Sequence, residues 1–207
     1  MNTSSRHPDA PAPARAEHAS LLLVRHGRTT LNAAGQLRGR LDPALDEVGL
    51  TQVQDLAEAL RAYGPRLVVS SPLRRALQTA EAIAEASGVG LVIDGDLVDR
   101  EYGRWAGHSP DELEQQWGSV DSAPGVETWP WLSHRAVRAL EGDYPSEPVV
   151  LVTHEAVLQA MLEHLEPEHP RPRQDPACWN VVVRDETGRL RLTAANRRAS
   201  DAVTTTA

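Results

Sequence analysis

Two short apolar runs that each end at a histidine constrain the fold of this chain most. Residues 21–24 are Leu-Leu-Leu-Val and lead into Arg-His-Gly, while residues 148–152 lead into Thr153 and His154. Apolar runs of this length, bounded by polar residues, are typical of strands that are buried on both faces. Strands of that kind occur mainly in parallel sheets with helices on either side. The runs therefore predict two buried strands, each with a histidine at its carboxyl end.

Helical patterns and further strands lie between these two runs. Residues 51–63 and 72–87 carry apolar side chains at i, i+3, i+4 and i+7 and end at glycines, and residues 155–165 continue the same pattern after the second histidine. Residues 66–70 and 91–93 are two more short apolar runs. Strands that alternate with helices predict an α/β fold, a three-layer sandwich with a mainly parallel central sheet flanked by helices.

The remaining segments are less regular. Residues 179–184 and 189–194 are joined across Glu-Thr-Gly, which predicts a hairpin or an edge pair. The segment 107–148 is rich in Pro and Trp, and we expect helices near 110–117 and 132–140 within it.

The 207-residue chain is long enough for one domain, which we place at residues 20–198. Residues 1–19 are rich in Pro, Ala, Ser and charge and lack periodicity, so we expect a disordered N-terminal tail. Residues 199–207 are expected to form a frayed C-terminal tail.

Composition limits the classes of partner. A hydrophobic share of 41% and a charged share of 24% are those of an ordinary globular protein. No apolar run approaches the roughly 20 residues that span a bilayer, and the N-terminus has no apolar export segment, so we expect a cytoplasmic protein with no membrane partner. The formal net charge of -8 disfavours nucleic acid as a partner. A few arginines in one cleft still allow such a protein to bind a phosphate.

Cationic and imidazole side chains gather at the carboxyl ends of the predicted strands. Arg25 and His26 follow the first strand, Arg75 begins the helix after the 66–70 strand, and His154 follows the later one. In an open α/β sheet the ligand lies at these strand ends. Each residue alone fits a structural or solvated role, but four of them at one edge of the sheet predict a site for a phosphoryl group.

Residues 23–32, Leu-Val-Arg-His-Gly-Arg-Thr-Thr-Leu-Asn, resemble the Arg-His-Gly signature of the histidine phosphatase superfamily, which has the phosphoglycerate-mutase-like fold. Residues 71–80 resemble its second arginine motif, and residues 152–154 resemble its second histidine motif. Gly49 and the helix that follows it fit the usual connection between the first two motifs. The resemblance covers about residues 20–197, and four ordered motifs are far more specific than an Arg-His-Gly triplet.

The resemblance implies roles for individual residues. Neutral His26 would attack phosphorus in line and become phosphohistidine. The transferring oxygens would be bound by Arg25, Arg75 and His154, with Asn32 as a neutral donor and with Gly27 and Thr29 lining the loop. No metal and no cofactor would be needed, because the cationic side chains supply the charge stabilisation that Mg²⁺ gives elsewhere.

The same resemblance places the general acid three residues before an aromatic-Gly pair. Tyr102-Gly103 is that landmark here, which puts Asp99 at the acid position, where most relatives of the mutase type have Glu. Glu101 is a second candidate, and either residue alternatively forms a surface pair with a neighbouring arginine. A further departure is Glu155, which stands where Gly commonly follows the second histidine; it either orients or raises the pKa of His154, or caps the next helix.

The function implied is a metal-independent phosphomonoester hydrolase that acts on a small phosphorylated metabolite through a phosphohistidine intermediate. The alternatives are a phosphoglycerate-type mutase and, less favoured, a catalytically silent phosphate-binding module.

Overall fold

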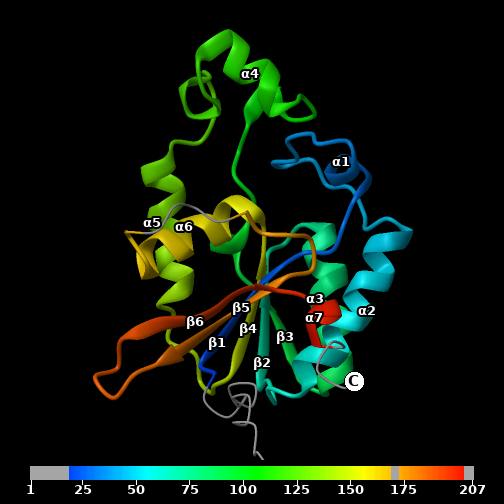
Figure 1. The fold of residues 1–207 in the computed structure, drawn as a ribbon, viewed down its shortest axis with the longest axis vertical. Coiled ribbons are helices and arrows are strands. Elements are labelled where there is room, and N and C mark those ends of the chain that lie inside the picture. Colours follow the sequence, from blue (N-terminus) through cyan, green and yellow to red (C-terminus); the bar gives the residue numbers. More distant parts are fainter. Residues whose placement is uncertain (1–18, 169–172, 203–207) are drawn as a thin grey trace, which may run out of the picture.

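The structure is a computed structural model that describes residues 19–168 and 173–202 (Figure 1). The predicted disordered tail lies outside the described residues, apart from Ala19, whose side chain is buried against the core. Residues 203–207 of the predicted C-terminal tail lie outside them too. Where that tail was expected to begin, the chain instead forms a short helix, α7 (Ala199–Ala202), near α2 (Glu47–Arg61).

A six-stranded sheet forms the centre of the molecule, in the order β3-β2-β4-β1-β5-β6. The strands are, in chain order, β1 (Leu21–Arg25), β2 (Leu67–Ser70), β3 (Gly90–Ile93), β4 (Val149–Thr153), β5 (Trp179–Arg184) and β6 (Leu190–Arg197). The first four are parallel, and the hairpin β5-β6 continues the sheet in antiparallel fashion beyond β1. The predicted α/β fold with a mainly parallel sheet is confirmed.

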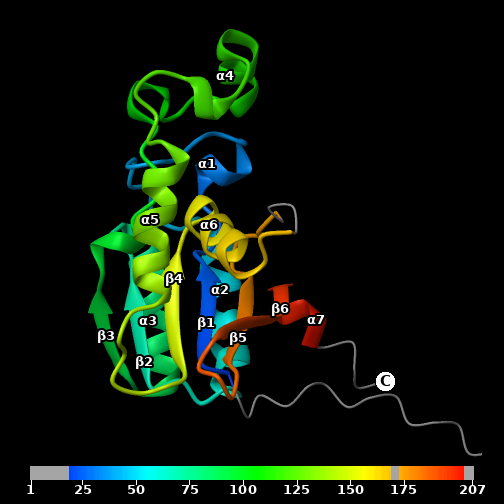
Figure 2. The same cartoon turned by 90° about the vertical axis from the view of Figure 1, so that its left-hand side faces the viewer.

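The side chains of β1 point alternately to the two faces of the sheet, and helices cover both faces. Leu21 and Leu23 belong to one apolar cluster, with residues of α5 (Trp129–Leu140) and α6 (Glu155–Leu165). Leu22 and Val24 belong to a second cluster, with residues of α2 and α3 (Arg74–Ser87). Because successive side chains of a strand point to opposite faces, one wholly apolar run serves both cores. Figure 2 shows the helices on both sides of the sheet.

The first residues of α2, α3 and α5 differ from the starts of the periodic segments by two to four residues. Helix α2 begins at Glu47, since the Asp46 carboxylate accepts a hydrogen bond from the backbone N–H of Gly49 at 2.8 Å. Helix α5 begins at Trp129, with a proline in its first turn. Helix α6 has the predicted bounds.

The segment between β3 and β4 extends beyond the carboxyl ends of the strands. The part of it that holds α4 (Pro110–Trp117), a helix that starts at a capping box, lies at the far end of the molecule beyond α1 (Thr30–Ala33) (Figures 1 and 2). A small apolar cluster, separate from the two main cores, joins this segment to the loop after α1 and consists of Leu37, Tyr102, Trp105, Leu113 and Ala123. The segment therefore covers the edge of the sheet at which the predicted site residues lie.

Candidate active site

The pairing of β1 with β4 brings the two histidines together. Arg25 is in register with Thr153, so His26 and His154 leave the sheet side by side. Their ring centroids are 5.1 Å apart, and both side chains are fully buried. The two strands thus end side by side, as the sequence predicts.

The ring of His26 is fixed with one nitrogen available for reaction. Its Nδ1 lies 2.7 Å from the backbone oxygen of Gly27, which can only accept, so Nδ1 carries the hydrogen and donates it. The lone pair is then on Nε2, which receives a hydrogen bond from Nε of Arg75 at 3.2 Å. Burial, followed by the charges of His154 and nearby arginines, holds the pKa of His26 well below its usual value. The ring is therefore neutral at neutral pH.

Arg75 joins the loops of the site. It lies in the first turn of α3 and is fully buried. Its Nη2 donates to the Asp99 carboxylate at 2.8 Å and to the backbone oxygen of Gly39 at 3.0 Å, and its Nη1 donates to the backbone oxygen of Leu41 at 2.7 Å. One guanidinium group thus contacts both the nucleophile candidate and the acid candidate.

One ring nitrogen of His154 has a hydrogen-bond partner, and the other has none. Its Nε2 lies 2.8 Å from the hydroxyl of Ser71, while its buried Nδ1 has no hydrogen-bond partner and is 3.8 Å from the Asp99 carboxylate. Burial and then the charges of Arg75 and other arginines lower its pKa well below the usual value. The net shift of the His154 pKa is thus opposite to the direction that a neighbouring carboxylate such as Glu155 favours.

The side chain of Glu155 points instead to two arginines. Its carboxylate is 3.0 Å from Nη2 of Arg25 and 3.7 Å from Nη2 of Arg38. Each arginine also keeps a buried Nε without a hydrogen-bond partner. Arg38 was not among the predicted site residues, because it lies in an irregular loop outside the motifs and only its position after the first motif could have marked it.

The other residues of the first motif shape the loop. The N–H of Gly27 donates to the Thr79 hydroxyl at 3.1 Å, and a Cβ there would lie 2.7 Å from a methyl carbon of Val53. Thr29 and Asn32 form a capping box at the start of α1, in which the Asn32 side-chain oxygen accepts from the N–H and the hydroxyl of Thr29. Thr29 therefore holds the loop and does not line the cavity, whereas Asn32 does.

Asp99 and Glu101 lie in different surroundings. Asp99 is 2% exposed, and its second oxygen accepts from the N–H of Arg100 at 2.9 Å. The carboxylate of Glu101 is 40% exposed, 3.6 Å from Arg40, and accepts from the N–H of Gly103. Of these two acid candidates, only Asp99 contacts the buried residues of the site in the interactions that the structure gives.

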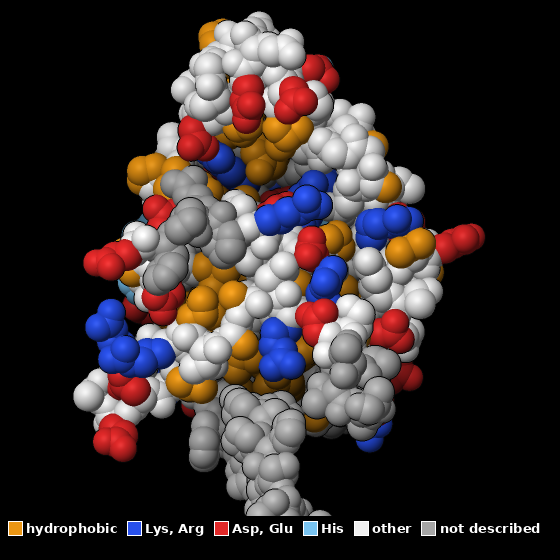
Figure 3. Space-filling model, viewed as in Figure 1, with side chains coloured by type: hydrophobic (Ala, Val, Ile, Leu, Met, Phe, Trp, Pro, Cys, Tyr) orange, Lys and Arg blue, Asp and Glu red, His pale blue; other side chains and the backbone are white. Residues whose placement is uncertain are grey.

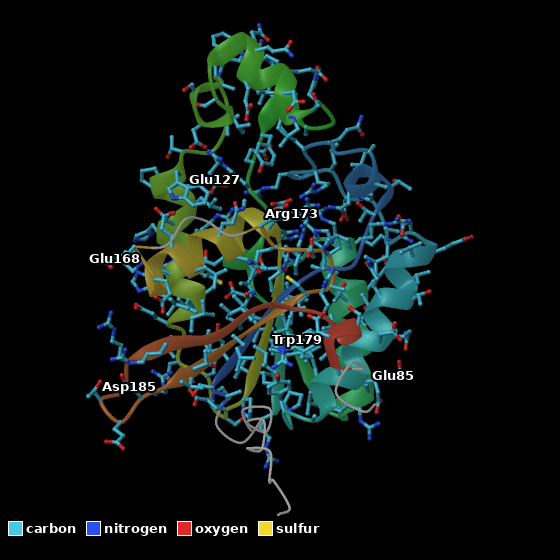
Figure 4. The ribbon with its side chains drawn as sticks, in the orientation of Figure 1. Glu85, Glu127, Glu168, Arg173, Trp179 and Asp185 are labelled. Carbon is cyan, nitrogen blue, oxygen red and sulfur yellow. The ribbon has the colours of Figure 1, made fainter. Side chains whose placement is uncertain are left out.

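A buried ion pair supports the loop that carries Asp99. Arg135 of α5 donates to both carboxylate oxygens of Glu127 and to the backbone oxygens of Asp96, Val98 and Asp99. Glu127 also accepts from the N–H of Glu101, and although its burial acts in the opposite direction, these hydrogen bonds hold its pKa below the usual value. Figure 4 labels Glu127 just before the start of α5.

A cavity of about 320 Å³ opens beside the buried groups. Its lining includes Arg25, Asn32, Arg38, Tyr102, Glu155 and Arg173, the last of which is labelled in Figure 4. On the space-filling surface, basic side chains gather below α4 on the same face (Figure 3). The cavity is polar and net cationic, as a site for an anionic small molecule would be. Among the described residues, no group of three or more His, Cys, Asp or Glu has the arrangement of a metal site, and no helix is long and apolar enough to cross a membrane.

Comparison with known proteins supports this description. The chain is 35% identical over 162 residues to "Bifunctional protein Rv2228c" of Mycobacterium tuberculosis, a match that covers 72% of this chain and 44% of that protein. The chain thus spans less than half of that relative. It is also 35% identical over 187 residues to the metal-independent phosphoserine phosphatase of Arabidopsis thaliana, covering 82% and 79% of the two chains.

The solved structure of a mycobacterial glucosyl-3-phosphoglycerate phosphatase in complex with VO3 is similar, with a TM-score of 0.72 and 29% identity over 85% of this chain and 98% of the other. These last two relatives are named as phosphatases. Residues 21–197 match the model of the histidine phosphatase superfamily, branch 1. The chain belongs to this superfamily, branch 1.

Proposed function

We propose that this chain is a metal-independent phosphomonoester hydrolase that acts on a small phosphorylated metabolite through a phosphohistidine at His26. The observation that carries the proposal is the fixed, neutral ring of His26 beside buried cationic groups. Its Nδ1–H is held by the backbone of Gly27, and its Nε2 faces Arg75. A neutral imidazole with one defined lone pair is a nucleophile, whereas a protonated ring is not.

The reaction divides into two displacements at phosphorus. In the first, the lone pair of His26 Nε2 forms an N–P bond while the ester O–P bond breaks, and the departing oxygen takes a proton from Asp99. In the second, water loses a proton to Asp99 and forms an O–P bond as the N–P bond breaks, which releases inorganic phosphate.

Side chains already present can stabilise the transferring oxygens. Within the described part of the chain, three buried side-chain nitrogens have no hydrogen-bond partner, namely Nε of Arg25, Nε of Arg38 and Nδ1 of His154. Buried donors of this kind are costly unless a ligand satisfies them. The guanidinium groups of Arg25, Arg38 and Arg75 would supply the charge stabilisation that metal ions give in other phosphoryl transfers. We therefore expect activity in excess EDTA, and its loss with recovery on adding Mg²⁺ would reject metal independence.

The intermediate can be tested directly. Enzyme mixed with a ³²P-labelled phosphomonoester and quenched should carry a label that is lost in acid and survives in base, as a phosphohistidine is. His26→Ala should carry no label. A label that persists in His26→Ala, or that survives acid as a serine ester does, would reject the mechanism.

The mutase alternative can be separated from hydrolysis by its products. Asp99 and His154 are only 55 positions apart, which leaves little chain for a basic lid that would exclude water from the phosphohistidine. We therefore expect 3-phosphoglycerate with catalytic 2,3-bisphosphoglycerate to give phosphate and little 2-phosphoglycerate. Rapid isomerisation without phosphate would favour the mutase, and absence of both reactions and of p-nitrophenyl phosphate hydrolysis would favour a silent binding module.

The proposal also concerns where the enzyme acts and what it binds. We propose a cytoplasmic enzyme whose partner is a small phosphomonoester, with neither nucleic acid nor membrane involved. Two features support this, the net charge of -8 and a cavity of about 320 Å³, which suits a small molecule.

A further inference from the structure

A carboxylate inside a cationic cavity needs an explanation. Glu155 lines the cavity together with Arg25 and Arg38, and its carboxylate contacts both guanidinium groups. An anion-binding site gains affinity from its cations, and a fixed negative charge beside them reduces that affinity. The position of Glu155 therefore works against phosphate binding.

Glu155 lines the cavity, whereas the reactive groups are buried. His26, Arg75 and His154 are fully buried. The cationic residues that line the cavity are Arg25, Arg38 and Arg173. The Glu155 side chain is 26% exposed, so it reaches both the arginines and the solvent. An incoming phosphate thus meets two arginines that already bind a carboxylate.

We propose that the Glu155 carboxylate is a resident counter-anion of the phosphate site, which the substrate phosphate displaces from Arg25 and Arg38 and which returns when phosphate leaves. In this role Glu155 lowers the affinity of the site for inorganic phosphate and limits inhibition by this product. The inference rests on the proposed function, since it concerns the site where the phosphoryl group would bind. It assigns Glu155 to positioning and affinity, with no part in bond making.

The test is direct binding of inorganic phosphate to the full-length protein, measured by calorimetry without turnover. Glu155→Gln keeps the size of the side chain and removes its charge. At an effective dielectric constant of about 20, a charge a few ångströms from the ligand changes affinity by an order of magnitude or more, and partial exposure reduces this. We expect the Kd for phosphate to fall about tenfold, with a similar fall in KM for p-nitrophenyl phosphate and no rise in kcat.

Two further variants make the result specific. Glu155→Ala removes the same charge and changes the shape, so it should also tighten phosphate binding. Glu58→Gln removes one negative charge from the exposed surface of α2 and should leave phosphate binding and turnover unchanged. Melting temperatures of all variants show whether each one folds.

The outcomes are distinct. Tighter phosphate binding by both Glu155 variants, with Glu58→Gln unchanged, supports the counter-anion role. Unchanged or weaker binding in folded Glu155→Gln overturns it, because Glu155 then caps α6 or holds Arg25 in place for the ligand. If the wild-type protein neither binds phosphate nor hydrolyses p-nitrophenyl phosphate, the proposed function itself fails, and the inference fails with it.

Discussion

Replacing Asp99 by Asn tests the acid and the buried ion pair together. The Asp99 carboxylate lies 2.8 Å from Nη2 of Arg75, and the two side chains are 3% and 0% exposed. Removing one partner of a buried ion pair typically costs about 3–5 kcal/mol of stability. Arg75 keeps its hydrogen bonds to Gly39 and Leu41, and Asn keeps one acceptor oxygen. We therefore expect Asp99→Asn to lose about 3 kcal/mol, the lower end of that range.

The kinetic effect should depend on the leaving group. Asn cannot transfer a proton, and a positioned general acid contributes about 10²- to 10⁴-fold. An alkyl phosphate should therefore be hydrolysed at least about 10²-fold more slowly by Asp99→Asn. The p-nitrophenolate group departs with little need of a proton, so its rate should fall by about tenfold or less, from the disturbed Arg75 alone.

The assay compares kcat/KM for glycerol phosphate and p-nitrophenyl phosphate, below the melting temperature of the variant. Glu101→Gln is the matched control, because it neutralises the other acid candidate, whose side chain is 40% exposed. Equal losses on both substrates would show that Asp99 is not the acid. A larger leaving-group dependence in Glu101→Gln would assign that role to Glu101.

Three other substitutions or conditions test separate parts of the structure. Burial lowers the pKa values of His26 and His154, so below about pH 6.5 the unfolded chain binds more protons than the folded one. The free energy of unfolding should therefore fall as the pH drops through that range, by up to about 1.4 kcal/mol per pH unit for each histidine. Urea titrations at several pH values should show a smaller dependence of this free energy on pH for His154→Gln. Arg135→Gln should slow alkyl phosphate hydrolysis more than that of p-nitrophenyl phosphate, because it acts through the acid-bearing loop; equal slowing would contradict this. Gly49→Ala should destabilise by about 1–3 kcal/mol in urea, since its Cβ would lie 2.1 Å from a backbone oxygen, whereas Gly90→Ala, with open space around its Cβ, is the control.

Strands β1, β2 and β4 could be predicted from sequence because each is a continuous apolar run, and burial on both faces leaves no other place for such a run. Helix ends were less predictable, because a cap decides them locally. The carboxylate of Asp46 starts α2 four residues before the periodic segment, and Thr29 with Asn32 starts the four-residue α1, which has no buried residue to give it a pattern. Helix α7 near α2 likewise lacks an apolar signal in sequence.

The residues of the site differ in the same way: some could be placed from the local sequence, and others only from contacts between distant segments. His26 and His154 could be placed because each directly follows a buried strand and parallel strands end at one edge. Arg38 and Glu155 could not be paired, since they lie 117 positions apart and meet only when an irregular loop folds over the start of α6. A departure from a family motif shows that a residue is unusual, and only its three-dimensional neighbours show why. Here the Glu155 carboxylate contacts Arg25, the residue next to His26, and this contact is the reason for proposing that Glu155 tunes the affinity for phosphate.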